Sequence, residues 1–218
     1  LVGSEMCIRD RKSTDIFYIS EVSLIEGFFS LRNTLEGSAL ANYIADVARD
    51  ISTENTNEEK LLRLTLNALY AISKAQKPLP IIKAVFELRS VCYAGFLPRL
   101  NGCNGCGKAP LETYFFDISD GVFFCDDCYH AREKLFLTQS EKVNEAEGIY
   151  ADTHIIMQIS PSVFSAVIYA LSSPMERIFS FTLESDALRD FSSLCEKYLL
   201  CHLERDFKTL DFYKSVIN

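Results

Sequence analysis

Two Cys-x-x-Cys pairs place the tightest constraint on what this sequence can fold into. Cys103 and Cys106 form the first pair, Cys125 and Cys128 form the second, and 18 residues separate the pairs. Two residues between cysteines let a tight turn direct both sulfur atoms at one point, and two such turns supply the four thiolates that tetrahedral zinc prefers. The pattern predicts one structural zinc ion within residues 103–128, with no coordination position left for a catalytic water.

The spacer between the two pairs is typical of a β hairpin. Residues 114–118 and 122–125 are β-prone, and the turn sequence Ser-Asp-Gly at 119–121 joins them. Such a hairpin brings the two pairs together. Gly105 and Gly107 allow the positive φ angles that a metal-binding turn often needs. The zinc site is therefore expected on a small β element.

A redox pair, a disulfide pair and a chance spacing are the other interpretations of these cysteines. A redox Cys-x-x-Cys usually occurs singly and opens a helix after a strand, and neither pair has that setting. The double spacing and its context favour zinc over these alternatives.

The composition indicates an ordinary soluble protein. The chain has 218 residues, of which 48% are hydrophobic and 24% charged, so it can bury a core of one main domain with at most a small appendage. Cys92, Cys195 and Cys201 fall in apolar helical patterns, which suits a reducing cytoplasm better than a disulfide scaffold. No apolar run reaches membrane-spanning length and no signal-peptide pattern opens the chain, so no membrane is expected as a partner.

Helical periodicity dominates the rest of the sequence. Apolar residues recur at three- and four-residue spacing, with caps or prolines at several boundaries. Helices are predicted from residue 21 to about 35, over 40–51, from 58 to 72, over 80–93, over 129–136, from a Ser160 cap and Pro161 to 171, over 175–179 and over 186–206. The predicted fold is mostly α, a helical domain into which a four-cysteine zinc-binding β hairpin is inserted.

The first twenty residues do not fit this helical pattern. Residues 1–11 (LVGSEMCIRDR) have no periodicity and resemble the read-through of sequencing adapters, so we expect them to be a non-native segment. Residues 16–19 are a strand candidate too short to form a sheet alone. We expect residues 12–20 to be the remnant of a truncated N-terminal domain and residues 21–218 to form the helical domain.

The charge distribution singles out one basic segment. The net charge is −8, yet residues 60–108 contain eight basic side chains against one acidic side chain, Glu87. This segment runs directly into the zinc site. A surface for an acidic partner such as nucleic acid and a solvated helix face are equally good interpretations of it.

Several motifs resemble the bacterial recombination mediator family RecO. They are Phe-Glu-Leu-Arg at 86–89, Gly-Phe-Leu-Pro at 95–98, Cys-Asn-Gly-Cys-Gly at 103–107 and Gly-Val-Phe-Phe-Cys-Asp-Asp-Cys at 121–128. The resemblance covers about residues 15–218. It implies an N-terminal OB-fold followed by a helical domain that in many members bears a four-cysteine zinc site. Most of the OB-fold is absent, and residues 12–20 would be what remains of it.

The resemblance also implies a function and partners. RecO proteins do not catalyse a reaction; they bind single- and double-stranded DNA, anneal complementary strands, contact the C-terminal tail of SSB, and join RecR to load RecA. Such a protein would work in the bacterial cytoplasm at the nucleoid. The family's zinc ligands correspond to Cys103, Cys106, Cys125 and Cys128. The alternative is an accessory zinc-knuckle helical domain of an enzyme whose catalytic N-terminal part is missing.

Five cations are the candidates for DNA or SSB-tail binding: Lys74, Lys77, Lys83, Arg89 and Arg99. Lys83 and Arg89 accompany Ile82, Val85 and Phe86 on one predicted helix, and an apolar groove with a few cations suits a peptide with acidic residues and a hydrophobic end. The other interpretation makes the three apolar residues core, which we favour, and turns the cations to solvent, which stays open.

The histidines offer no catalytic site. His130 follows the second cysteine pair, but four thiolates already complete a zinc shell. His154 and His202 have no partner motif. No metalloprotease, phosphate-binding or nucleophile motif occurs in the sequence.

Overall fold

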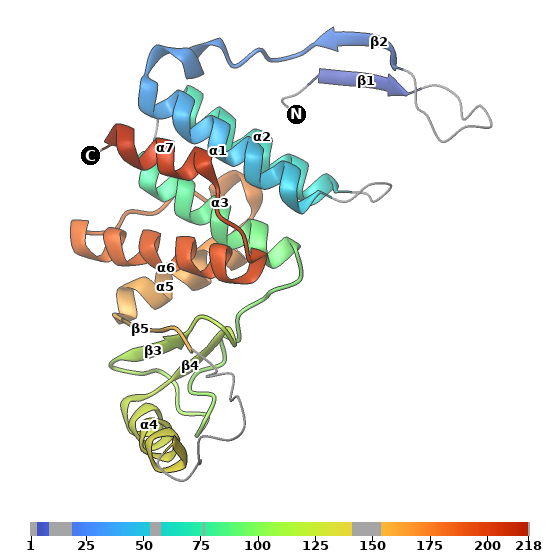
Figure 1. Cartoon of the computed structure of the whole chain (residues 1–218). Helices are drawn as coiled ribbons and strands as arrows, with labels where there is room; N and C mark the ends of the chain where they lie inside the picture. The colour runs from blue at the N-terminus through green and yellow to red at the C-terminus, as the bar shows by residue number, and fades with distance from the viewer. Residues whose placement is uncertain (1–3, 9–18, 53–57, 76, 141–153, 218) are drawn as a thin grey trace, which may run out of the picture. The chain divides into compact units, whose positions relative to one another are not determined.

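The computed structural model describes residues 4–8, 19–52, 58–75, 77–140 and 154–217 (Figure 1). The chain forms two compact units, one made of residues 1–79 with 207–218 and the other of residues 80–206. The first unit is discontinuous, because the C-terminal helix returns to it after the second unit is complete.

The first unit is built on three helices that pack side by side (Figure 1). They are α1 (Leu35–Ile51), α2 (Glu59–Ser73) and α7 (Lys208–Ile217). Each contributes one apolar stripe to the core, as the spacing of their apolar residues predicts. Tyr43 of α1 meets Phe207 edge to face at 5.9 Å between ring centroids, and Thr209 donates a hydrogen bond of 2.8 Å to Asp46.

The start of α1 requires a glycine at position 37. Thr34 caps the helix, its Oγ1 accepting a hydrogen bond of 3.1 Å from the backbone N–H of Gly37. A Cβ at Gly37 would lie 2.7 Å from that Oγ1 and 3.3 Å from Ile72 of α2. Glycine therefore permits both the cap and the close approach of α1 to α2, and one helix runs through the position.

The helix predicted from residue 21 is wrong. The structure has strand β2 (Ile19–Leu24) there, antiparallel to β1 (Ser4–Ile8), and then the 3-10 helix η1 (Phe29–Asn33). Leu24 is 68% exposed and Ile25 51%, so the apolar spacing reflects no buried helical face. Short apolar runs fit strand and helix alike. Residues 16–18 of the predicted strand lie outside the described residues, and the origin of residues 1–11 and the OB-fold remnant stay predictions.

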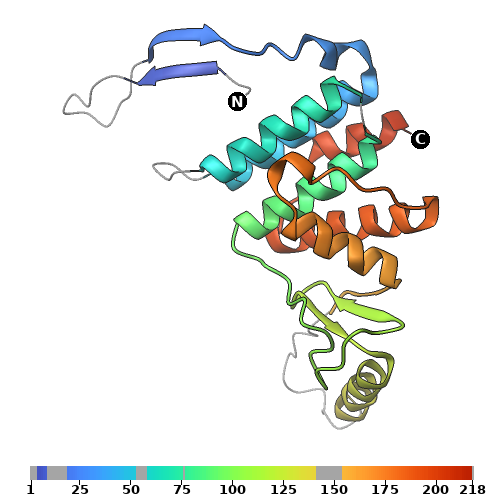
Figure 2. The ribbon, with the colours of Figure 1, turned by 180° about the vertical axis from the view of Figure 1, so that it is seen from behind.

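The second unit combines three helices with a small sheet that is followed by a fourth (Figure 2). The three helices are α3 (Leu79–Tyr93), α5 (Pro161–Ser172) and α6 (Ser185–Leu203), with the 3-10 turn η2 (Met175–Arg177) between the last two. Ser160 caps α5 through a hydrogen bond of 3.4 Å from the N–H of Val163, which confirms the predicted start of that helix.

The sheet contains β3 (Tyr114–Asp117), β4 (Val122–Phe124) and β5 (Ile156–Ile159), in the order β4-β3-β5 with antiparallel pairing. Gly121 has a φ of 64° in the turn between β3 and β4, a conformation that favours glycine. The sequence analysis missed β5. Helix α4 (Asp126–Ser140) follows β4 directly and is longer than the predicted helix over 129–136.

Helix α3 is the most deeply buried element of the second unit. Every residue from 81 to 91 is buried. Ile82, Val85 and Phe86 are fully enclosed, which confirms their prediction as core residues. The same stretch also contains charged side chains, and their partners decide whether those charges can bind anything else.

Candidate metal centre and cationic residues

The four predicted cysteines lie together. Their Sγ atoms are all within 4.8 Å of one another, and those of Cys106 and Cys125 are 3.8 Å apart. Cys103 and Cys125 are buried, Cys128 is half-buried and Cys106 is exposed. Four sulfur donors at this separation could hold one metal ion, and thiolates suit zinc, copper(I) or iron–sulfur centres among the transition metals.

Backbone hydrogen bonds shape the first cysteine turn. The N–H of Gly107 donates to the Cys103 carbonyl over 2.8 Å, and the N–H of Cys103 donates to the Lys108 carbonyl over 3.0 Å. The N–H of Asn104 donates over 2.7 Å to Phe123 of β4, so this turn is attached to the sheet. The second pair follows β4 directly, with Cys128 in the first turn of α4.

The two glycines of this turn act in different ways. Gly107 has a φ of 74°, as predicted. Gly105 does not have a positive φ angle, so the expectation of a positive φ is wrong for this residue. A Cβ at Gly105 would lie 2.9 Å from the Sγ of Cys128 and 3.7 Å from that of Cys103. Its glycine is needed for space beside the thiols.

The thiols differ in how readily they lose a proton. Burial opposes ionisation of Cys103, but N–H groups of Cys125, Cys106 and Gly105 lower its pKa to about 6. Contacts with the thiols of Cys125 and Cys103 raise the pKa of Cys128. Burial and neighbouring thiols also raise the pKa of Cys125, although the N–H of Cys128 acts in the opposite direction. Cys103 therefore ionises more readily than Cys125 and Cys128, and a metal must displace protons from those two thiols.

The histidines do not complete the sulfur cluster. His130 is exposed on α4, and its ring nitrogens lie 3.5 Å from Asp126 and 3.2 Å from Glu133. His202 stacks on Phe96 with 4.5 Å between ring centroids, and burial lowers its pKa. Asp126 and Asp127 are exposed in the first turn of α4.

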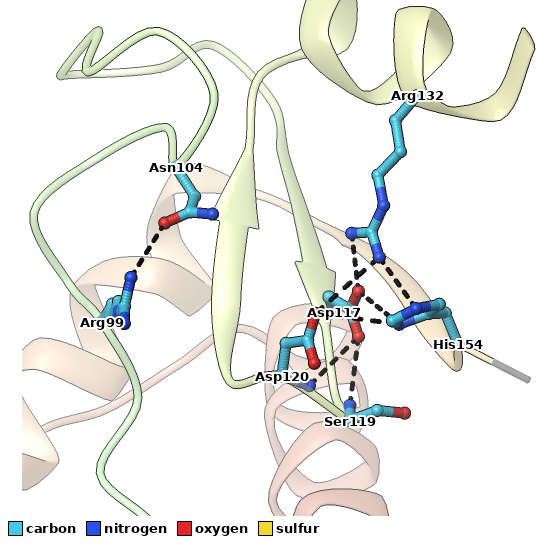
Figure 3. A network of polar contacts seen from close by, with 7 residues as sticks. All are labelled: Arg99, Asn104, Asp117, Ser119, Asp120, Arg132 and His154. Atoms are coloured by element: carbon cyan, nitrogen blue, oxygen red, sulfur yellow. Dashed lines mark hydrogen bonds and ion pairs between the residues drawn. The ribbon is translucent and has the colours of Figure 1, made fainter. Parts of the chain in front are cut away.

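His154 belongs to a polar cluster that the sequence analysis did not find (Figure 3). Asp117, which is 0% exposed, accepts hydrogen bonds from the N–H groups of Ser119 and Asp120 at 3.2 and 3.3 Å. Arg132 of α4 reaches the same carboxylate at 2.8 Å, and Nδ1 of His154 lies 2.9 Å from it. The aspartate ahead of a Ser-Asp-Gly turn is a readable signal. Nothing in the sequence links it to a histidine 37 positions later.

Lys83 and Arg89 are bound inside the protein. The Nζ of Lys83, only 3% exposed, lies 2.8 Å from Glu87 and 2.7 Å from Glu196 of α6. Burial alone would lower the pKa of Lys83, but the two carboxylates outweigh it and raise the pKa. Both cations were expected either to bind a partner or to face solvent, and neither side chain faces solvent.

Arg89 caps the end of a neighbouring helix. Its Nε donates to the carbonyl of Ala170 over 2.6 Å, and Nη2 donates to the carbonyls of Leu171, over 3.5 Å, and Ser173. These are the carbonyls that the C-terminus of α5 leaves without intrahelical partners. The guanidinium therefore serves the fold of the second unit. A role for Lys83 or Arg89 in binding stays a prediction, and it would require these internal bonds to break.

The other three predicted cations are accessible. Lys74 is exposed at the end of α2, with its Nζ 5.1 Å from the centroid of the Tyr70 ring. Lys77 is half-buried in the same unit. Arg99 is exposed in the second unit beside the first cysteine turn, with a hydrogen bond of 3.4 Å to Asn104 (Figure 3). The predicted basic segment thus divides into buried structural cations and exposed ones.

In the described part of the chain, we find no helix with the length and apolar character needed to cross a bilayer.

Comparison with known proteins gives a consistent result. The sequence model of the family described as "Recombination protein O C terminal" matches residues 32–143, which include all four clustered cysteines. A DNA repair protein RecO of Acetivibrio thermocellus is 28% identical over 206 residues, 94% of this chain and 73% of the relative. The DNA repair protein RecO of Caldicellulosiruptor bescii is 23% identical over 206 residues, which are 94% of this chain and 75% of the relative. The DNA repair protein RecO of Anaeromyxobacter sp. strain K is 33% identical over 122 residues, which are 56% of this chain and 48% of the relative.

Proposed function

This chain belongs to the family of recombination protein O (RecO), and we propose that it serves DNA repair and recombination as a mediator that performs no catalysis. The observation that carries the proposal is the family match over residues 32–143, together with relatives named DNA repair protein RecO that align with 94% of the chain. No observation favours the alternative of an accessory domain from an enzyme.

We propose that Cys103, Cys106, Cys125 and Cys128 hold one structural zinc ion. The four-sulfur donor set and its compact arrangement support zinc, because tetrahedral sites of four cysteines are typical of structural zinc. When bound, the ion cross-links the first cysteine turn to the turn that opens α4. A shell of four thiolates has no open position for water, so the ion stabilises structure only.

We propose that DNA, single- or double-stranded, contacts the exposed cations. Lys74 and Lys77 are the candidates in the first unit, and Arg99 is the candidate in the second. Contacts of this kind neutralise phosphates and release counterions, so they weaken steeply as salt concentration rises. With a net charge of −8 opposing them, we expect this chain alone to bind DNA weakly.

Family membership supports a proposal about the protein partners. We propose that the protein binds the C-terminal tail of SSB and RecR, promotes strand annealing and RecA loading, and works in the bacterial cytoplasm at the nucleoid. The same accessible cations suit the acidic residues of an SSB tail. Lys83 and Arg89 are poorer candidates, because their bonds to Glu87, Glu196 and the end of α5 hold them inside the protein.

A titration of the chain with fluorescent oligonucleotide at low and at physiological salt tests the proposal. We expect weak binding that fades as salt rises. Lys74→Ala or Arg99→Ala should each reduce the salt slope by about one, because each removes one cation that neutralises a phosphate. Lys208→Ala removes an exposed cation outside the basic segment and is the matched control. Binding that survives physiological salt and ignores these substitutions would contradict this assignment of DNA-binding residues.

A further inference from the structure

The described part of helix α4, residues 126–134, presents few side chains to the rest of the protein. Within its described side chains, residues 126–134, only Cys128, Tyr129 and Arg132 are not exposed. An apolar stripe of the kind that docks most surface helices is therefore missing from this part of α4. Within residues 126–134, three specific contacts take the place of apolar burial.

Each of the three side chains contacts a different partner. The Sγ of Cys128 joins the sulfur cluster. The ring of Tyr129 stacks on Phe115 of β3 with 4.2 Å between centroids and 5° between planes. Arg132 lies one helical turn after Cys128 and so on the same face of α4, and its guanidinium enters the polar cluster at the end of β3.

That polar cluster is closed by hydrogen bonds from three segments (Figure 3). The Nη1 of Arg132 is 2.8 Å from Asp117, and its Nη2 is 3.0 Å from Nε2 of His154. Arginine only donates, so Nε2 accepts and we assign the imidazole proton to Nδ1, which lies 2.9 Å from Asp117. The Cζ of Arg132 also lies 5.0 Å from the centroid of the Phe124 ring, beside the cysteine pair.

A second metal site is the rival interpretation of this cluster. Asp117, Asp120 and His154 bring ligand atoms within 4.8 Å of one another. The guanidinium of Arg132, however, is 2.8 Å from Asp117 and 3.7 Å from Asp120, where it supplies the positive charge that these carboxylates need. Arg132 is therefore the resident cation of the cluster.

We propose that Arg132, held by Asp117 and His154, is a positioning residue for the metal centre. Its ion pair docks α4 on the turn between β3 and β4 and thereby holds Cys128 beside the other three thiols. This inference rests on the proposed metal function of the four cysteines. Because docking and metal binding require the same position of α4, each strengthens the other by the same factor.

Cobalt(II) tests the proposal, because its sulfur-to-metal charge-transfer absorption reports only metal bound by thiolates. The whole chain is titrated with cobalt under reducing conditions, in competition with a chelator, as wild type, Arg132→Ala and Asp117→Asn. We expect roughly tenfold weaker binding in each variant, the lower end of the effects seen for residues that orient metal ligands. Lys134→Ala removes an exposed positive charge from the same helix and should bind cobalt as the wild type does.

The sulfur signal also separates the two possible sites. Arg132→Ala frees Asp117, Asp120 and His154, so cobalt bound there would raise the stoichiometry without adding charge-transfer absorption. The double variant of Arg132 and Asp117 should lose little more cobalt affinity than either single variant, because both substitutions break the same interaction. Arg132→Lys should recover part of the affinity, because it restores the charge without the planar geometry.

The outcomes are distinguishable. A wild type that shows no thiolate-bound cobalt contradicts the proposed metal centre itself. A wild type that binds, with Arg132→Ala and Asp117→Asn unchanged in affinity, overturns the positioning role and leaves the metal centre in place. Should Arg132→Ala fail to fold by circular dichroism, Asp117→Asn decides, because it removes the carboxylate charge that pairs with Arg132 and keeps the shape of the side chain. Unchanged cobalt affinity in that folded variant overturns the proposal too.

Discussion

Helices α3 and α4 both have 15 residues, yet opposite principles hold them in place. Helix α3 is buried along its whole middle, and even its charged side chains find partners inside the protein. Helix α4 exposes six of its nine described side chains, and the other three form a thiol contact, an aromatic stack and an ion pair.

This contrast indicates which parts of the protein depend on a metal. Burial of apolar side chains is not directional, and many small contributions add up to the free energy that holds α3 in place. No single contact is therefore essential to the position of α3. In α4 each contact is specific and carries a large share of the docking energy. We therefore expect metal loss to release α4 and the cysteine turns, while α3 and its neighbours stay folded.

The largest effect should come from breaking the metal centre. Cys125→Ser should abolish metal binding, because structural zinc sites rely on all four ligands and metal binding is coupled to local folding. Elemental analysis of protein purified without chelator should show about one zinc per wild-type chain and none in the variant. Cys201→Ser, a cysteine outside the cluster, should keep the zinc. A Cys125 variant with full zinc content would exclude this site.

The next largest effect should come from removing one member of the buried ion pair in α3. Lys83→Met leaves Glu87 buried without its cation, which should lower the free energy of unfolding by about 3–5 kcal/mol. Urea unfolding followed by circular dichroism measures this. Lys74→Met, at an exposed position, should change stability by less than about 0.5 kcal/mol. Equal, small effects of both substitutions would show that the Lys83 ion pair does not stabilise the core.

A smaller effect should follow from crowding the thiols. Gly105→Ala places a methyl group 2.9 Å from the Sγ of Cys128, so metal affinity should fall by about 1–3 kcal/mol, the usual cost of overpacking. Competition with a chromophoric chelator measures the change. Gly95→Ala strains a positive-φ position with no atom in contact, so it should cost stability but leave metal affinity intact. Unchanged affinity in the Gly105 variant would mean that Cys128 shifts without cost.

A pH series separates the two helices by protonation. Cys125 and Cys128 have raised pKa values and must lose protons to bind metal, so affinity should rise about tenfold per pH unit for each proton released. Lys83 has a raised pKa, so its stabilising charge is fully present below its ordinary value of 10.5 and is lost only as pH rises through the higher folded value. Chelator competition and urea unfolding between pH about 6 and about 8 should thus show a pH-dependent metal site and an unchanged Lys83 contribution. Metal affinity that does not depend on pH would contradict the assigned thiol protonation.

Much of this protein can be predicted from local sequence, because the signals concerned act over a few residues. The two Cys-x-x-Cys pairs identify the four sulfur donors that the structure brings within 4.8 Å. The Ser160 cap, followed by Pro161, locates the start of α5, and the apolar spacing of α3 identifies its core residues. In each case the feature depends on turn geometry or helical period, which a short segment contains in full.

Tertiary contacts alone set which charges are available and which segments meet. The sequence around a helical lysine does not tell whether its side chain faces solvent or a buried glutamate. The partner of Lys83 is Glu196, which lies 113 positions later, so the sequence pattern does not predict this contact. The meeting of Asp117, Arg132 and His154 depends in the same way on β5 pairing with β3. The spacing around Leu24 fits a helix, yet pairing with β1 makes it a strand. The partners of buried charges and of paired strands are set by contacts between separate chain segments, and the local pattern contains no record of those partners.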